Sequence, residues 1–301
     1  MKDTGTEQRV LKLSVLLTAL IAGTAVVLGL LSGSMSIVFD GLFSVIDVAM
    51  GLLLLWVAGL VKREENRTFQ YGYWHIEPMT LAFNGGMLML LCIYAVVNAV
   101  SSFMGGGQDV ELGWAIGYSV IMSVVAFGMY LYERRANRSV RSDFLHLDAQ
   151  SWLMSAFVAT ALLVAFAFAW VIGKTQYAYL APYVDPAVLG LLSLVLINMP
   201  LKTVRQAVSE MLMITPTELD TRVRTVMDAV VSRHGFTSYT SYAAKVGRGQ
   251  FIEIHIVVPP DLQIGTVATL DTIREEIGTA LGADGVEKWL TIDFTAQTRW
   301  T

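Results

Sequence analysis

Residues 39–47 read Phe-Asp-Gly-Leu-Phe-Ser-Val-Ile-Asp and place two carboxylates inside an apolar run, residues 35–61, that is long enough to cross a bilayer. A carboxylate at membrane depth costs several kcal/mol unless it meets water, a cation or a polar partner, so such residues are kept for a function. Asp40 and Asp47 therefore indicate a functional site inside the membrane. The alternative for Asp47 is a packing role, hydrogen-bonded to a polar side chain on a neighbouring helix.

A second polar stretch, residues 143–150, lies just ahead of another apolar run and reads Asp-Phe-Leu-His-Leu-Asp-Ala-Gln. It brings His146, Asp148 and Gln150 to the start of that run. Asp148 fits a helix-start charge as well as it fits a ligand. We interpret the two stretches together as one cation site.

Helix geometry limits this site. Asp40 and Asp47 are seven residues apart in the sequence, which puts them nearly on one face but about 10.5 Å apart along the axis, at ~1.5 Å per residue. We therefore do not expect one ion to touch both. Residues four apart are neighbours on a helix surface, so the chelating pairs are Phe43 with Asp47 and His146 with Gln150. Phe43 brings no ligand atom.

The composition indicates an integral membrane protein. The chain has 301 residues, of which 54% are hydrophobic and only 15% charged, and its mean hydropathy is positive. The single cysteine, Cys92, excludes a disulfide framework and a thiolate metal cluster. We expect the first apolar run to be a retained helix rather than a signal peptide, because no small-residue cleavage site with a soluble domain follows it.

Segments of about 20 apolar residues, enough to cross ~30 Å of hydrocarbon, predict six membrane spans. They lie near residues 11–32, 35–61, 78–103, 112–132, 150–173 and 184–204. Lysine and arginine cluster before the first span, between the second and third, between the fourth and fifth, and after the sixth, whereas the opposite loops carry only Lys174. By the positive-inside rule, both termini are cytoplasmic.

The chain changes character near residue 205, where charged residues become frequent and apolar runs become too short to span a membrane. We expect a transmembrane transport domain over residues 1–205 and a cytoplasmic domain over residues 206–301. Residues 215–218, Thr-Pro-Thr-Glu, predict a helix with a capping box and proline at its first position. Two strands joined by residues 247–249, a second helix and a last strand follow. The order αββαβ is typical of a small ferredoxin-like α+β sheet with helices on one face.

Several motifs have an order typical of one family. Acids lie in span two, and His146 lies at the head of span five. Residues 71–78, Tyr-Gly-Tyr-Trp-His-Ile-Glu-Pro, precede span three, and Asp185-Pro186 opens span six. Residues 250–255, Gln-Phe-Ile-Glu-Ile-His, lie in the tail. With six spans, cytoplasmic termini and an αββαβ tail, these motifs resemble the cation diffusion facilitator family of proton-coupled divalent metal exporters, over nearly the whole chain.

The resemblance implies a tetrahedral intramembrane site, with two ligands four apart on span two and a His and an Asp four apart on span five. Here these positions are Phe43, Asp47, His146 and Gln150, and only Asp47 and His146 match. The usual zinc set of His and carboxylate ligands is therefore incomplete. We expect a site that is displaced, harder in character, or impaired.

Two further carboxylates extend this site. Asp40 matches a position where many family members have Asp, and Asp148 lies near His146 in the sequence. The expected metal ligands are therefore Asp47, His146, Asp40, Gln150 and Asp148. Asn84 of span three is more often a packing residue than a ligand. His255 matches a tail ligand position of the family but lacks histidine partners, so we expect the tail to bind divalent metal weakly or not at all.

The resemblance implies a secondary transporter that exports divalent metal cations, such as zinc, cobalt, manganese or iron, from the cytoplasm in exchange for protons. The metal is a substrate, and no cofactor is expected. Two alternatives stay open: a monovalent cation/proton antiporter on the same scaffold, and a transport-impaired membrane adaptor. The chain has neither a His-Glu-x-x-His motif nor a phosphate loop, so we do not expect an enzyme.

The expected partners are the metal cation, protons, the lipid bilayer and a second copy of the chain, joined through the cytoplasmic domain as in the family. No nucleic acid is expected. The expected location is the cell membrane, as a multi-pass protein of a bacterial inner membrane.

Overall fold

The computed structural model describes residues 4–61, 67, 69–140, 143–247, 249–263, 265–282 and 287–300. The chain divides into two compact units. One comprises residues 1–53 and 84–202, and the other comprises residues 54–83 and 203–301. The segment around residues 71–78, before the third predicted span, therefore groups with the tail.

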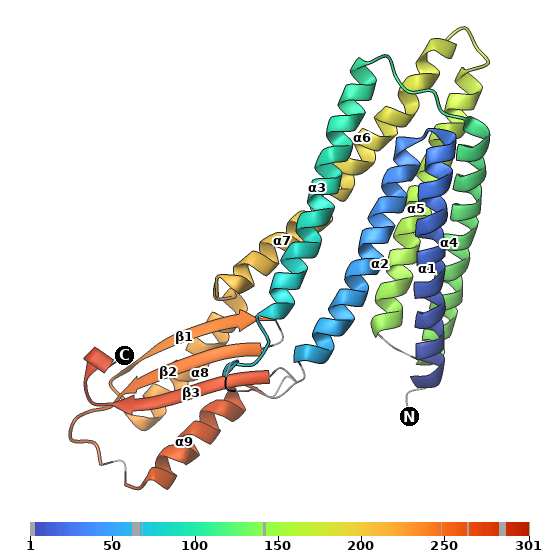
Figure 1. Ribbon diagram of the computed structural model, residues 1–301. Helices are drawn as coiled ribbons and strands as arrows, with labels where there is room; N and C mark the ends of the chain where they lie inside the picture. The colour runs from blue at the N-terminus through green and yellow to red at the C-terminus, as the bar shows by residue number, and fades with distance from the viewer. Residues whose placement is uncertain are drawn as a thin grey trace. The chain divides into compact units, whose positions relative to one another are not determined.

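The chain is mainly helical as far as residue 211. Its helices are α1 Thr4–Ser32, α2 Met35–Val61, α3 Ile76–Met104, α4 Leu112–Val140, α5 Asp143–Ile172, the 3-10 helix η1 Ala178–Tyr183, α6 Val184–Leu196 and α7 Asn198–Met211 (Figure 1). Within the described residues, five segments are long and apolar enough to cross a membrane. They are Lys12–Ser32, Ile76–Met104, Leu112–Arg138, Asp148–Ile172 and Ala178–Met211. The remaining predicted span, residues 35–61, forms α2.

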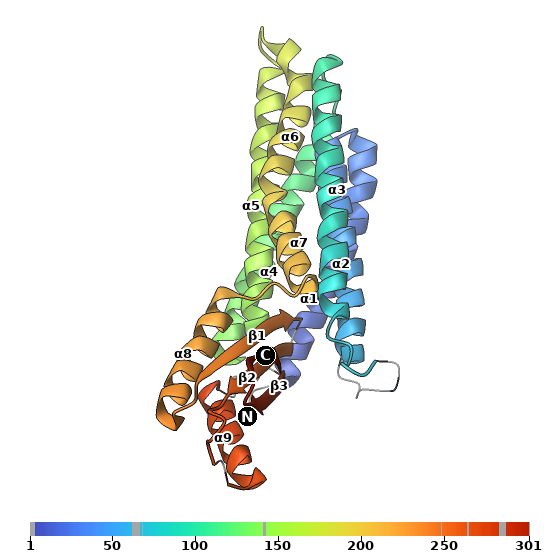
Figure 2. The ribbon, with the colours of Figure 1, turned by 90° about the vertical axis from the view of Figure 1, so that its left-hand side faces the viewer.

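A first apolar core joins α1, α2, α4 and α5. Fully buried alanines allow close approach of the helices, and Tyr118, Leu162 and Phe166 fill the space between them. α4 lies along α5, and α1 packs on α4 (Figures 1 and 2). Gly41 of α2 faces α1 so closely that a Cβ atom there would lie 2.8 Å from the backbone nitrogen of Val26. Only glycine allows this helix contact.

A second apolar core joins α2 to α3 and α6. Its buried members include Phe39 of α2, Cys92 of α3 and Leu189 of α6, and Phe43 packs against them. Ile37 packs in the first core and Phe39 in the second, so the first turns of α2 contribute side chains to both cores. Asp40 lies on this doubly packed part of α2.

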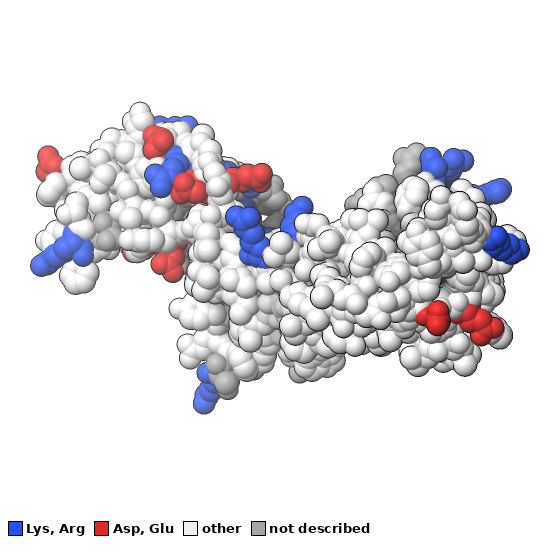
Figure 3. All heavy atoms as spheres, turned by 90° about the horizontal axis from the view of Figure 1, so that it is seen from above, with Lys and Arg blue, Asp and Glu red and all other residues white. Residues whose placement is uncertain are grey.

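The outer surface of these helices is apolar. Leu20, Leu30, Leu90 and Phe157 are each more than half exposed. Most of the surface of the helical unit that faces the viewer in Figure 3 carries no charged side chain. Large exposed apolar surfaces need an apolar surrounding. The helical unit is therefore that of a multi-pass membrane protein.

Asp185 of α6 caps the start of α2. The Ser34 hydroxyl donates to Asp185 Oδ1 at 2.6 Å, and the Met35 backbone N–H donates to Oδ2 at 3.0 Å. A third donor, the Ser36 backbone N–H, lies 3.4 Å from Oδ1. The first N–H groups of a helix have no partner within the helix, so this carboxylate satisfies them from a distant element. The Asp185-Pro186 motif thus joins α2 to α6.

The sixth predicted span is built from two helices. α6 ends at Leu196, and α7 begins at Asn198. Pro200 has no backbone N–H to donate to the carbonyl of Leu196, so the helical ladder is interrupted. The Asn198 side chain donates to the carbonyls of Leu194 and Val195 at 3.2 and 3.1 Å, which replaces part of the lost bonding.

The tail forms a three-stranded sheet with helices in the predicted order αββαβ. Its elements are α8 Thr217–His234, β1 Ser238–Val246, β2 Gly249–Val257, α9 Val267–Ala280, β3 Glu287–Thr295 and the 3-10 helix η2 Thr298–Trp300. The strand order is β1-β2-β3, antiparallel and then parallel, with Ile254 opposite Ile292. Alternate residues of β2, Ile252, Ile254 and Ile256, pack against α8 and α9 in one core.

The other face of the sheet carries an aromatic group. Phe251 and Trp289 stand side by side on β2 and β3. Trp74 packs edge-on against Phe251 at 5.2 Å between ring centroids, and Tyr71 lies 5.3 Å from Trp289. A Cβ atom on Gly249 would lie 2.0 Å from Trp74 Cε3, so the indole covers bare backbone. The motif of residues 71–78 thus packs on the tail sheet.

The predicted capping box at residues 215–218 is wrong. α8 begins at Thr217, with Pro216 as its N-cap residue and no side-chain cap. The Thr215 hydroxyl instead donates to the carbonyl of Ala243 at 2.6 Å. The local sequence pattern predicted that the Thr215 hydroxyl caps α8, but this hydroxyl bonds to β1 instead. At the other end, Gly235 ends α8 with a φ of 66°.

Candidate metal centre

Asp40 is held by a tyrosine of α4. The Tyr118 hydroxyl donates to Asp40 Oδ2 at 2.8 Å, and Tyr118 is only 3% exposed. Asp40 is half-buried, so its carboxylate lies at the contact between α2 and α4. Tyr118 could not be singled out from the sequence, because one tyrosine in an apolar span is usually a packing residue.

Phe43 fills a packing position. Its ring lies 6.1 Å from that of Phe39, and it packs against the core that contains Cys92 and Leu189. The side chain at position 43 therefore supports the contact of α2 with α3 and α6. Phe43 has no atom that can bind a metal, at a position where the family resemblance implies a metal ligand.

Asp47 and His146 belong to α2 and α5, but their side chains lie outside the described part of the structure. Both remain predicted ligands on the grounds given by the sequence.

Asp148 lies next to a carboxylate that the sequence pattern does not single out. Glu133 of α4 is completely buried, and it interacts with Asp148 of α5 and Ser14 of α1. Both oxygens of Glu133 and Asp148 Oδ2 are buried without a hydrogen-bond partner. Glu133 was overlooked because it directly precedes Arg134 and Arg135, which made it look like part of a solvated basic cluster.

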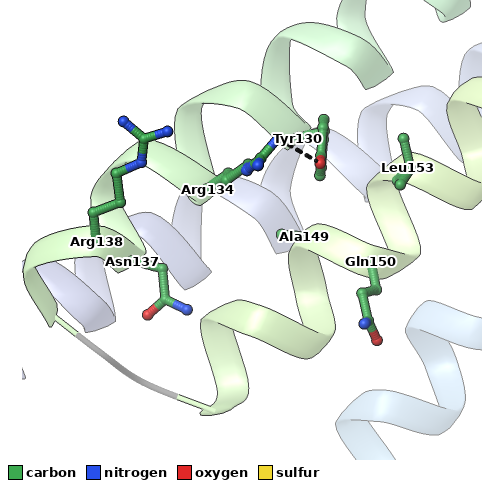
Figure 4. Close-up of a pocket in the computed structure, with 7 residues that line it drawn as sticks. All are labelled: Tyr130, Arg134, Asn137, Arg138, Ala149, Gln150 and Leu153. Atoms are coloured by element: carbon green, nitrogen blue, oxygen red, sulfur yellow. Dashed lines mark hydrogen bonds between the residues drawn. The ribbon is translucent and has the colours of Figure 1, made fainter.

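Gln150 is exposed and lines a cavity of about 390 Å³ between α4 and α5 (Figure 4). The other lining residues are Tyr130, Arg134, Asn137, Arg138, Ala149 and Leu153. Arg134 Nη1 donates to the Tyr130 hydroxyl at 3.2 Å, and the Gln150 amide points away from both residues in Figure 4. The polar lining of this cavity is therefore partly basic.

Among the described residues of the membrane unit, the polar atoms that could bind a metal ion are mainly oxygens. Asn84 Oδ1 of α3 is buried and has no hydrogen-bond partner, like the carboxylates of Glu133 and Asp148. No group of three or more His, Cys, Asp and Glu side chains converges within the described ranges. Oxygen donors favour hard cations, whereas zinc prefers nitrogen and sulfur donors.

The tail histidines are paired with carboxylates. His255 Nδ1 lies 2.6 Å from Asp293 Oδ2 across β2 and β3. His234 Nε2 lies 2.9 Å from Glu276 Oε2, and this hydrogen bond, with the charge of Arg233, holds the pKa of Glu276 below its usual value. Each histidine therefore has an acidic partner and belongs to a pair rather than to a histidine cluster.

Helices with an apolar outer surface and interior carboxylates indicate a membrane transport protein. The family model of the cation efflux transmembrane domain matches residues 11–212 of this chain. The chain therefore belongs to the cation efflux family, that is, to the cation diffusion facilitators, which are transporters and not enzymes.

Three individual relatives are each 22–24% identical in sequence to this chain. The uncharacterised transporter YdbO of Bacillus subtilis is 24% identical over 188 residues, which are 61% of each chain. The cadmium, cobalt and zinc/H(+)-K(+) antiporter of the same bacterium is 22% identical over 147 residues, 47% of each chain. The metal cation efflux system protein CzcD of Cupriavidus metallidurans is 22% identical over 170 residues, 56% of this chain and 54% of CzcD. This chain thus matches 47–61% of the length of these relatives.

Proposed function

We propose that this protein exports divalent metal cations from the cytoplasm in exchange for protons. The observation that carries the proposal is the family match over residues 11–212, which includes the helices bearing the interior carboxylates. The names of two relatives, a cadmium, cobalt and zinc antiporter and a metal cation efflux protein, agree with this activity.

In this proposal, Asp47 and His146 bind the ion at the centre of the membrane unit. The remaining predicted ligands, Asp40, Gln150 and Asp148, lie further along the path of the ion, because Asp40 is too far along α2 from Asp47 for one ion to touch both. Only the deprotonated carboxylates and the neutral imidazole bind a metal, so metal and protons compete for one site. The metal enters from the cytoplasm, and protons from outside displace it as the helices change access around the site.

Tyr118 is a positioning residue in this scheme. Its hydrogen bond to Asp40 fixes the carboxylate of α2 against α4. An ion that binds Asp40 competes with this donor, so occupancy of the site changes the contact between the two helices.

The proposed topology has six spans, over residues 1–205, with both termini in the cytoplasm of a bacterium. Residues 206–301 then form a ferredoxin-like cytoplasmic domain through which two copies of the chain associate. The αββαβ order and the one-sided core of the tail support this architecture.

A monovalent cation/proton antiporter is the second candidate. Phe43 replaces a metal ligand by a packing side chain, and the described interior donors are mainly oxygens, which also suit sodium. A third possibility, an adaptor without transport, would follow if the incomplete site binds no ion.

Uptake by inverted membrane vesicles tests these alternatives together. The expected result is proton-driven uptake of manganese, cobalt or zinc that an empty-vector membrane lacks. Uptake that requires sodium, with no response to divalent metals, would replace the first candidate by the second. Vesicles that transport neither class of ion would favour the adaptor.

A further inference from the structure

We propose that Glu133, Asp148 and Ser14 form a second cation site, which binds a hard divalent ion such as Mn²⁺ or Mg²⁺ between α1, α4 and α5. Glu133 and Asp148 come from the facing helices α4 and α5, and Ser14 comes from α1. This site takes Asp148 from the ligands proposed above for transport, but it uses neither Asp47 nor His146 and does not depend on their role.

Burial is the first argument. Glu133 is 0% exposed, and neither of its oxygens has a hydrogen-bond partner. The polar groups that interact with it are a second carboxylate, Asp148, and the Ser14 hydroxyl. Two carboxylates in an apolar interior, with only a neutral hydroxyl beside them, are costly unless something of opposite charge joins them. A cation between Glu133 and Asp148 removes this cost.

The described residues around this pair are mainly apolar. Trp152, Ala156 and Met129 form the apolar wall on α4 and α5. Trp152 Nε1 donates to Ser14 Oγ at 2.8 Å, which fixes the serine hydroxyl and leaves a lone pair on its oxygen. Arg134, the adjacent basic residue, donates instead to Tyr130 at the cavity lined by Gln150.

The donor set selects the kind of ion. Two carboxylates cancel the charge of one divalent cation, and the hydroxyl adds a third oxygen. Oxygen ligands suit Mg²⁺ and Mn²⁺, with water completing the coordination shell, whereas zinc prefers nitrogen or sulfur. Three donors from three helices also mean that the bound ion joins α1, α4 and α5.

The position in the helices gives access from one side. Glu133 lies five residues before the end of the segment Leu112–Arg138, about 7.5 Å at ~1.5 Å per residue, and Asp148 is the first residue of Asp148–Ile172. Because α4 and α5 follow each other in the chain and lie side by side, both carboxylates lie on the same side of the helical unit. By the charge of the neighbouring loop, this is the cytoplasmic end.

The test counts bound Mn²⁺ on the purified full-length protein in detergent, from the electron paramagnetic resonance signal of the free ion. Glu133→Gln and Asp148→Asn are each expected to weaken the same Mn²⁺ equivalent at least ~10-fold, since loss of even a supporting group at a metal site costs that much. Ser14→Ala weakens it less. Glu111→Gln, which neutralises an exposed acid on the same helical unit, is the matched control and leaves binding unchanged.

The outcomes separate this site from the transport site. Asp47→Asn is expected to leave the Glu133-dependent equivalent in place, whatever it does to transport. If Glu133→Gln and Asp148→Asn elute as folded protein and bind Mn²⁺ as the wild type does, the proposal is overturned, and a shared proton neutralises the pair instead. If one variant does not fold, the other and Ser14→Ala decide. A strong preference of this equivalent for Zn²⁺ over Mn²⁺ would overturn the assignment of a hard ion.

Discussion

Asp47 is the residue on which the proposed transport depends most. Asp47→Ala removes the carboxylate proposed to bind the ion, so cation transport is expected to be lost while the protein stays folded and inserted. The measurement is metal uptake by inverted vesicles, with the amount of membrane-inserted protein determined by immunoblot. Transport at the wild-type rate would show that the ion binds elsewhere.

Tyr118 offers a test of how Asp40 is held. Tyr118→Phe keeps the ring in the first core but removes the hydrogen bond to the carboxylate, at an expected cost of about 1 kcal/mol in unfolding free energy. Tyr94→Phe is the matched control, because Tyr94 is exposed on α3. Thermal unfolding in detergent is the measurement. Equal shifts for the two variants would mean that the Tyr118 bond contributes nothing to stability.

Single residues also show where sequence reasoning stops. Asp40 stood out because a carboxylate in an apolar run is unusual, and the structure gives it a partner. Glu133 did not stand out, because two arginines follow it in the sequence and suggest an exposed charged segment, whereas its side chain is completely buried. Local sequence shows which residues are charged, but burial depends on which helix covers them.

Among the elements, α2 depends on a cap supplied by another helix. Asp185→Ala leaves the Met35 and Ser36 N–H groups without an acceptor and is expected to cost about 2 kcal/mol, near the upper end for a cap. Hydrogen exchange should become faster at these two amides, in addition to a lower melting temperature. Asp109→Ala, in an exposed loop, is the control. Unchanged exchange at the start of α2 would contradict the cap.

The tail sheet gives a second test through two glycines. A Cβ atom on Gly249 would collide with the Trp74 ring, so Gly249→Ala is expected to destabilise the tail unit by about 1–3 kcal/mol. In Gly278→Ala, the new methyl group lies 3.6 Å from Leu290 Cδ2, an ordinary contact, and alanine stabilises α9. Limited proteolysis of the full chain compares the two. The packing of Trp74 on Gly249 is refuted if both variants resist protease like the wild type.

Element prediction succeeded where one face of an element meets one core. The alternating Ile252, Ile254 and Ile256 fixed β2, and the apolar runs marked the helices. It failed where a contact distant in sequence decides, as with Thr215, whose hydroxyl bonds to β1 rather than capping α8. The cap of α2 by Asp185 is of the same kind, because its donors lie about 150 residues away in the chain.

Taken across the whole molecule, the order of the motifs carried the identification. No single motif identified the family, but the acids of α2, the histidine of α5 and the αββαβ tail follow one another in an order that resembles it, and the family match over residues 11–212 confirmed the resemblance. The ligand set could not be predicted to the same degree. Four positions had to be carried over from the family, and two of them hold residues that break its pattern.

Selectivity follows from what positions 43 and 150 lack, and it requires α2 and α5 to act together. Zinc gains most from histidine and charged ligands that close a tetrahedron, whereas an oxygen-rich, partly hydrated site suits manganese or magnesium better. Phe43→Asp combined with Gln150→Asp is therefore expected to raise zinc affinity at least ~10-fold, about 1.4 kcal/mol, with a smaller gain for manganese.

The control for this double variant is Phe43→Asn with Gln150→Asn, which removes the same Phe43 ring from the second core without adding charge. Any loss of stability from that core is then common to both proteins, and only the carboxylates differ. Competitive zinc and manganese binding to the purified wild type and both variants is the measurement. If the wild type already prefers zinc strongly and the aspartates change nothing, the ion binds at other residues, and the ligand positions carried over from the family do not hold for this chain.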